Sequence, residues 1–223
     1  MPGQGMCGVT EALDLYCERT GATFWAEPLN AVTNIVFIAV AVLVLRDWGR
    51  RRDDWPVLGL ALLTGAIGIG SFLFHTVATR WAAIADVLPI ALFIFAYFLL
   101  AMRRFLQLSM LRAFAATAGF VAASLVLVPF LERPFGGSAA YIPALLAIVG
   151  VGALLAWRED GRAAGLLLAG MLLTTSIAFR MTDLPLCAAF PIGTHFIWHM
   201  LNAAVLYVVM VTALDPRPRR RGV

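Results

Sequence analysis

The sequence predicts an all-α integral membrane protein with a bundle of seven transmembrane helices. Of its 223 residues, 61% are hydrophobic and 13% are charged, whereas a soluble domain has about 45–50% apolar and about 25% charged residues. The mean hydropathy is +0.87. The apolar residues gather in runs of about 20, the length that crosses ~30 Å of hydrocarbon. These features exclude a soluble domain, a disordered chain and a secreted disulfide scaffold.

The predicted spans are separated by short connections, which favour antiparallel neighbours in one bundle. They cover residues 28–45, 56–78, 81–102, 108–131, 139–157, 163–179 and 192–214. We divide the chain into an acidic extramembrane segment (1–27), the transmembrane domain (28–214) and a basic tail (215–223). The first segment lacks the basic and apolar regions of a cleavable signal peptide.

The arginines predict the orientation of the bundle. All 17 basic residues are arginine, and there is no lysine to form a retinal Schiff base. Thirteen of them fall on one side of the predicted spans: Arg46, Arg50, Arg51, Arg52, Arg103, Arg104, Arg112, Arg158, Arg162, Arg217, Arg219, Arg220 and Arg221. Four fall on the other side: Arg19, Arg80, Arg133 and Arg180. The positive-inside rule therefore predicts an outer N-terminus and a cytoplasmic C-terminus, in a plasma membrane of the bacterial type. The net charge of +4 reflects topology and indicates no nucleic-acid partner.

The three histidines of the chain all lie inside predicted spans, where ionisable groups are costly and mark functional sites. His195 and His199 are four residues apart, about 6 Å along one helix face. The second span runs outward and the seventh runs inward, so His75 lies at the same outer depth as this pair. The alternative for each histidine is an interhelical hydrogen bond. Three imidazoles at one depth favour a metal site, with zinc as the expected ion and a position left for water.

Three polar residues lie near the histidines. Asp86, in the first turns of the third span, is at the same depth and acts either as a general base or as the partner that orients a histidine. Ser71, one turn from His75, donates to an oxyanion or serves helix packing. Asn202 shares a face with the histidine pair, either as a second layer around the metal or as a packing residue. Arg180 and Asp183 are expected to pair in the last outer loop.

Several short motifs extend this pattern. Gly-Ile-Gly-Ser-Phe-Leu-Phe-His occupies positions 68–75, with Asp86 eleven residues further on, and His-Phe-Ile-Trp-His occupies 195–199. Tyr-Cys-Glu at 16–18 and Glu-Pro-Leu-Asn at 27–30 precede the first span. Together these residues resemble the alkaline ceramidases, part of a superfamily of seven-helix zinc hydrolases that includes the adiponectin receptors. The resemblance covers the first three spans and the last loop and span, while the fourth and fifth spans match only in hydropathy.

The resemblance implies a zinc site of His75, His195 and His199, with Asp86 handling the proton of the water and Ser71 steadying the oxyanion. It also implies a disulfide between Cys17 and Cys187, both on the predicted outer side, where such a bond persists. Cys7 is left without a role.

The resemblance further implies a calcium site before the first span, to which Glu18 and Glu27 match and Asp14 matches with an offset of one residue. Thr20 stands where the family has an amide ligand. A solvated acidic loop is the alternative to calcium binding.

We expect a zinc-dependent lipid amidase that opens toward the outer leaflet and cleaves ceramide or a similar N-acyl lipid to a long-chain base and a fatty acid. A receptor-like or haemolysin-like superfamily member with mainly structural zinc is one alternative. A small proton-coupled transporter that uses histidine and aspartate as a relay is another. The expected partners are the bilayer and its lipids.

Overall fold

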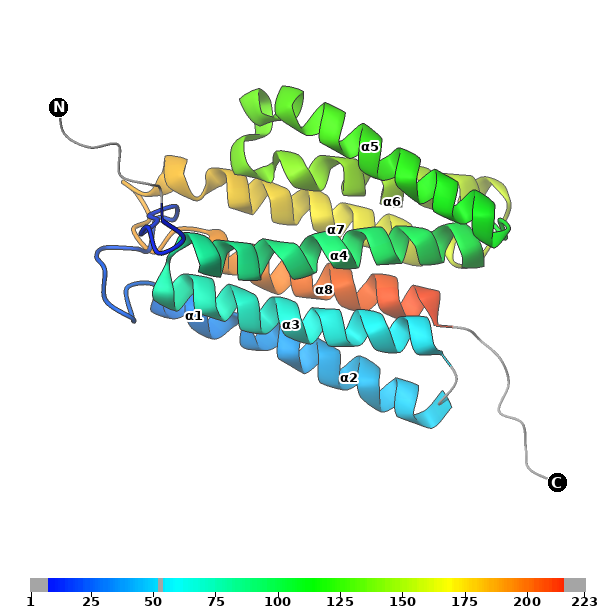
Figure 1. Ribbon diagram of the computed structural model, residues 1–223, viewed down its shortest axis with the longest axis horizontal. Helices are drawn as coiled ribbons and strands as arrows, with labels where there is room; N and C mark the ends of the chain where they lie inside the picture. Colours follow the sequence, from blue (N-terminus) through cyan, green and yellow to red (C-terminus); the bar gives the residue numbers. More distant parts are fainter. Residues whose placement is uncertain (1–7, 52–53, 215–223) are drawn as a thin grey trace.

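Eight α-helices run through the part of the chain that the structure, a computed structural model, describes: residues 8–51 and 54–214 (Figure 1). They are α1 (Pro28–Thr33), α2 (Ile35–Arg51), α3 (Trp55–Val77), α4 (Arg80–Arg104), α5 (Met110–Phe135), α6 (Ile142–Trp157), α7 (Ala163–Thr182) and α8 (His195–Ala213). Two 3₁₀ turns, η1 (Gly136–Tyr141) and η2 (Leu184–Leu186), link α5 to α6 and follow α7. The predicted all-α class is confirmed. Cys7 and the basic segment 215–223 lie outside the described residues.

Six stretches of the described chain are long and apolar enough to cross a membrane, against seven predicted spans. Five of them correspond to α1 with α2, to α3, to α4, to α7 and to α8. The sixth, Met110–Trp157, contains both α5 and α6, because η1 continues the helical path without a polar loop. The chain turns back at η1, so that α5 and α6 run antiparallel (Figure 1). With 16 residues, α6 is shorter than the roughly 20 of a full span.

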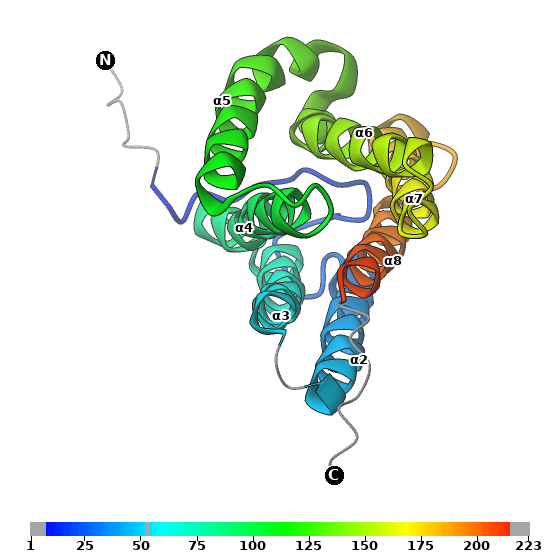
Figure 2. The same ribbon diagram turned by 90° about the vertical axis from the view of Figure 1, so that its right-hand side faces the viewer.

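The long helices form a closed ring when the bundle is seen end-on (Figure 2). Each helix contacts the next one along the chain, and α8 closes the ring against α2. This closure brings the start of α8 next to the end of α3, although a long stretch of chain separates them. Residues from both helices can therefore build one site at the end of the bundle where α8 begins.

Both ends of the bundle carry exposed tryptophan side chains. Trp25 and Trp81 are exposed at the end where α8 begins, and Trp55 and Trp157 are exposed at the opposite end. At that opposite end, Asp54 accepts a hydrogen bond from the Val57 amide at the start of α3, and an ion pair with Arg104 ties it to the end of α4. Tryptophans at both ends of an apolar bundle are typical of side chains at the two membrane–water interfaces.

The N-terminal segment (residues 8–27) lies across the end of the bundle where α8 begins (Figure 1). The Leu13 amide donates to the Ala78 carbonyl oxygen at 2.7 Å, which fixes the segment to the α3–α4 connection. A disulfide between Cys17 and Cys187 then joins the segment to the loop before α8. The disulfide implied by the family resemblance is thus confirmed, and it closes a separation of 170 residues.

We expect Cys17→Ser and Cys187→Ser to lower the free energy of unfolding by the same amount, about 2–5 kcal/mol, because each removes the same cross-link. The double variant should lose no more than either single variant. Denaturant unfolding of the protein in lipid nanodiscs measures this, with reduced wild type as the control that should match the variants. Two independent, additive losses contradict the prediction.

Candidate active site

Three buried histidines converge where α3 ends and α8 begins. His75 lies in the last turn of α3, and His195 and His199 lie in the first two turns of α8. One ligand atom from each ring can be chosen such that all three lie within 4.8 Å of one another. Every ring also has one buried nitrogen without a hydrogen-bond partner among the described residues: His75 Nε2, His195 Nδ1 and His199 Nε2. Since unpartnered buried nitrogens are costly, this donor set fits a metal ion, and three imidazoles suit zinc.

The other ring nitrogens of two histidines are held by residues at the two ends of α1. His75 Nδ1 lies 2.5 Å from Glu27 Oε2, and His199 Nδ1 lies 2.9 Å from the Thr33 hydroxyl. Glu27 also accepts hydrogen bonds from Arg19 and from the Asn30 side chain. Such outer partners fix the tautomer and orientation of ligating histidines. The sequence predicted neither Thr33 nor this role of Glu27.

The charge of Glu27 follows from these contacts. Burial by itself raises the pKa of this carboxyl, but the hydrogen bonds and charges of His75 and Arg19 outweigh burial and bring the pKa below its usual value. Glu27 therefore stays a carboxylate at neutral pH, which is the form that accepts a hydrogen bond from His75.

His195 is positioned through the loop before α8. One oxygen of Asp183 accepts hydrogen bonds from the amides of Thr194, at 2.7 Å, and His195, at 2.9 Å, so it satisfies the first amides of the helix. Its other oxygen accepts from the Cys17 amide at 2.9 Å. Gly193 adopts a φ of +66°, and a Cβ there would overlap the Asp183 carboxylate. This position therefore requires glycine.

Arg180 and Asp183, which both belong to the described part of the chain, do not form the expected ion pair. Both carboxylate oxygens of Asp183 accept hydrogen bonds from backbone amides of the loop and of the N-terminal segment. Arg180 instead donates to the hydroxyls of Ser138 and Tyr16, each at 3.2 Å. The expectation was wrong because amides that are distant in sequence donate hydrogen bonds to Asp183 in place of Arg180 on α7.

Ser71 and Asp86 lie beside the histidines, on the facing helices α3 and α4. Ser71 Oγ and Asp86 Oδ1 are buried and lack hydrogen-bond partners, and Asp86 lies close to Ser71 and within electrostatic range of His75. The helices lie very close together one residue earlier on each, where a Cβ on Gly70 would overlap the Ala85 carbonyl. The three predicted metal ligands and the two predicted catalytic residues, Asp86 and Ser71, thus lie together in one buried site.

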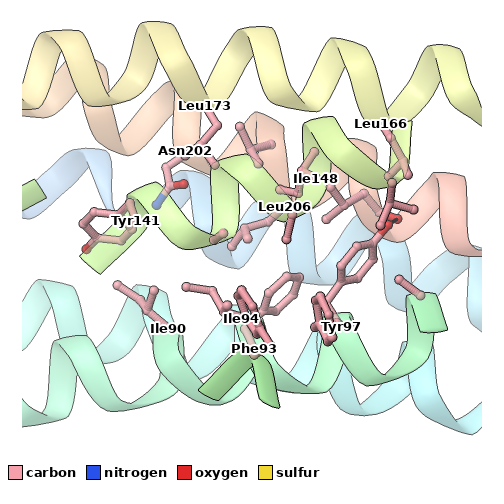
Figure 3. Close-up of a pocket in the computed structure, with 18 of the residues that line it drawn as sticks. Ile90, Phe93, Ile94, Tyr97, Tyr141, Ile148, Leu166, Leu173, Asn202 and Leu206 are labelled. Atoms are coloured by element: carbon pink, nitrogen blue, oxygen red, sulfur yellow. Dashed lines mark hydrogen bonds between the residues drawn. The ribbon is translucent and has the colours of Figure 1, made fainter. Parts of the chain in front are cut away.

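An apolar cavity lies between α3, α4, α6, α7 and α8, next to this site (Figure 3). Ile67 lies one turn from Ser71, Ile90 lies one turn beyond Asp86, and Asn202 lies three residues after His199, and all three line the cavity. The cavity continues along α4 to Tyr97 and Ala101. From Ile90 to Ala101 the helix rises ~16 Å, roughly half the ~30 Å hydrocarbon core and hence about one leaflet. Asn202, expected near the metal, is placed in the cavity wall.

The three acids matched to a calcium site are not brought together as a ligand group. Asp14 is exposed, and Glu18 accepts hydrogen bonds from the amides of Leu29, at 2.7 Å, and Asn30, at 2.8 Å, at the start of α1. Burial raises the pKa of Glu18, although both amides act in the opposite direction. A metal site needs at least three His, Cys, Asp or Glu side chains whose ligand atoms converge. Among the described residues, the three histidines form such a group, and the three acids do not. Calcium binding stays a prediction that the structure does not test.

We expect His75→Ala, His195→Ala and His199→Ala each to abolish metal binding, because each removes one imidazole. Glu27→Gln should retain the ion but bind it about 10–100-fold more weakly, as loss of an outer partner typically does. Competition with a chromogenic chelator measures both effects.

The matched control is Glu11→Gln in the same N-terminal segment, because Glu11 forms an exposed ion pair with Arg80 away from the histidines. Unchanged affinity in Glu27→Gln contradicts the assigned role of Glu27.

Gly70→Ala should disrupt the site, because the added methyl group overlaps backbone that cannot move aside like a side chain. We expect a loss of metal and of thermal stability, measured by elemental analysis and by unfolding in nanodiscs. Gly150→Ala on α6 is the control, since a Cβ there meets nothing within 4 Å. Equal effects of the two substitutions contradict the assigned helix approach.

A comparison with protein families places the chain in context. The family model described as Ceramidase matches residues 12–215, which include every residue of the site. A search of curated proteins finds no match for the chain.

Proposed function

We propose that this chain, which belongs to the ceramidase family, is a zinc-dependent membrane hydrolase of ceramide or a similar N-acyl lipid. Its products are a long-chain base and a fatty acid. Family membership supports a hydrolase that acts on an amide bond. The observation that carries the proposal is the convergence, among the described residues, of three unpartnered imidazole nitrogens with one unpartnered oxygen of Asp86 and the Ser71 hydroxyl next to an apolar cavity.

Zinc is proposed because three neutral imidazoles leave its full charge available. When bound, the ion supplies Lewis acidity and lowers the pKa of a coordinated water from 15.7 to about 7. The chain's own contribution is to hold His75 and His199 in one tautomer through Glu27 and Thr33, which presents the unpartnered nitrogens inward.

Asp86 and Ser71 carry the proton transfer and the stabilisation of charge. Asp86 takes a proton from the attacking water and delivers it to the amide nitrogen, so that the C–N bond breaks with an amine as leaving group. The Ser71 hydroxyl donates a hydrogen bond to the carbonyl oxygen as negative charge develops there. The absence of other partners for these two side-chain atoms leaves both ready for a substrate.

The cavity accepts the acyl chain of the substrate. Its aliphatic and aromatic wall runs for about the depth of one leaflet from the site. Each buried methylene contributes about 0.8 kcal/mol to binding. This arrangement suits a lipid that enters sideways from the bilayer while water reaches the site from the nearby end of the bundle.

We infer that α5 and α6 cross the membrane separately, which gives seven crossings, and that the site faces the outer side. The antiparallel course of α5 and α6 supports the first point. The second is supported by the arginines: Arg46, Arg103, Arg104, Arg112, Arg158 and Arg162 lie at the end of the bundle opposite the site. In this orientation the disulfide lies on the oxidising side.

We expect the purified protein to release fatty acid from N-acyl lipids, and a strong chelator to abolish this release. Asp86→Asn should keep zinc but lower turnover about 10²–10⁴-fold, the usual contribution of a general base. Ser71→Ala should lower turnover about 10²–10³-fold. Mass spectrometry of the products, together with elemental analysis, measures these effects.

Ser124→Ala is the matched control for Ser71→Ala, because Ser124 bonds only to the Phe120 carbonyl within its own helix. Full activity of Asp86→Asn removes this residue from the mechanism. A folded protein with stoichiometric zinc and no turnover on any N-acyl lipid favours the receptor-like alternative.

A further inference from the structure

Arg180 is a cation inside the site end of the bundle whose role the proposed hydrolysis does not explain. It lies in the last turn of α7, and its guanidinium carbon is 5.6–5.9 Å from the ring centroids of Tyr16, Tyr141 and Trp198. Three aromatic faces around one guanidinium attract the cation and hold it in place. A Cβ on Gly137 would lie 3.0 Å from one of its terminal nitrogens, so the chain leaves room there for the planar group.

The charge of Arg180 is not balanced by a direct partner. Within the described residues it forms no ion pair with a carboxylate, and its hydrogen bonds go to the neutral hydroxyls of Ser138 and Tyr16. Arg180 Nε is buried and has no partner. A guanidinium presents five donors in a fixed fork, so most of its hydrogen-bonding capacity is unused. An ionisable group of this kind within a membrane bundle is by default a candidate functional residue.

The surroundings of Arg180 connect it to the reacting centre and to the cavity. The Tyr16 ring stacks on His195 with centroids 3.7 Å apart, and the Trp198 ring stacks on His195 from its own helix, with centroids 5.1 Å apart. Tyr141, the third ring around Arg180, lines the cavity. Asp86 lies within electrostatic range of Arg180. Arg180 therefore borders both the rings that stack on His195 and a ring of the cavity wall, at the end of the bundle that the N-terminal segment covers.

We propose that Arg180 binds a carboxylate on the amine part of the substrate, so that the preferred substrates are N-acyl lipids of the N-acyl amino acid class. The inference rests on the proposed function and narrows its substrates to N-acyl lipids whose amine part is an amino acid, so that hydrolysis releases an amino acid and a fatty acid. With the acyl chain in the cavity and the amide at the histidines, the amine part projects toward Tyr16 and Arg180. A carboxylate one carbon from the amide nitrogen then meets the guanidinium fork, which matches it in a bidentate way.

The site's charges favour the same class of ligand. Arg19 is balanced by Glu27, and the carboxylate of Asp86 lies within electrostatic range of Arg180. If Asp86 is engaged with the proton of the water, Arg180 is left as a positive charge in a medium of low dielectric constant. An anionic group of the substrate restores neutrality there, whereas a neutral hydroxylated headgroup does not.

The test compares two substrates that share the acyl chain and the amide and differ in charge: N-hexadecanoylglycine and N-hexadecanoylethanolamine. For the wild type we expect kcat/KM to be about 10-fold or more higher for the acylglycine, as for a charge-assisted hydrogen bond. The ratio should fall to about 1 in Arg180→Gln. Arg133→Gln, an exposed arginine at the same end of the bundle, makes the same change in net charge and should keep the ratio.

A binding measurement separates this inference from the proposed function. In the Asp86→Asn background, the acylglycine should bind about 10-fold more tightly than the acylethanolamine, and Arg180→Gln should remove that difference. If no lipid is hydrolysed, the proposed function fails while the binding comparison still decides the role of Arg180. Equal binding of the two lipids, or a preference that survives Arg180→Gln, overturns the inference.

Arg180→Lys provides the second variant if Arg180→Gln does not fold. It keeps the charge and loses the planar fork, so the preference for the acylglycine should drop several-fold without disappearing. If the ratio of kcat/KM for the acylglycine to kcat/KM for the acylethanolamine equals that of the wild type, the inference is overturned. Metal content and unfolding of each variant show whether a change in preference arises from damage to the histidine site.

Discussion

The structure depends on a cluster of imidazoles buried in a membrane bundle and held there by a carboxylate. Glu27 reaches His75 from the start of the first helix and is itself held by Arg19. A charged side chain in such a place is stable only with partners of this kind. The N-terminal segment that carries these residues is therefore part of the candidate site, although it lies outside the apolar helices.

Much of this arrangement follows from local rules. Apolar runs predict the helices, and the spacing of His195 and His199 predicts a shared face. The alternating direction of the spans places His75 and Asp86 at the same depth. The structure brings these residues together as that reasoning expects. The division of Met110–Trp157 is less clear from hydropathy, because an apolar 3₁₀ turn replaces the polar loop that usually separates two spans.

The contacts that sequence reasoning did not predict are those whose partners come from distant parts of the chain. Glu27 meets His75 across 48 residues, and Asp183 meets the Cys17 amide across 166. Neither contact leaves a periodic signal in the sequence, so neither the hydrogen bond of Glu27 with His75 nor that of Asp183 with the Cys17 amide was predicted. One signal was present: an acidic residue directly before Pro28, at the entry to an apolar helix, is costly unless it has a specific partner.

The position of the histidines along the chain has a consequence for how the protein matures. Because His75 comes from α3 and the other two come from the last helix, no ribosome-bound intermediate that lacks α8 contains the complete triad. Loading of the ion must therefore follow insertion of the final helix. In the proposed orientation the site opens to the extracytoplasmic side, so the proposed activity would depend on the metal supplied there.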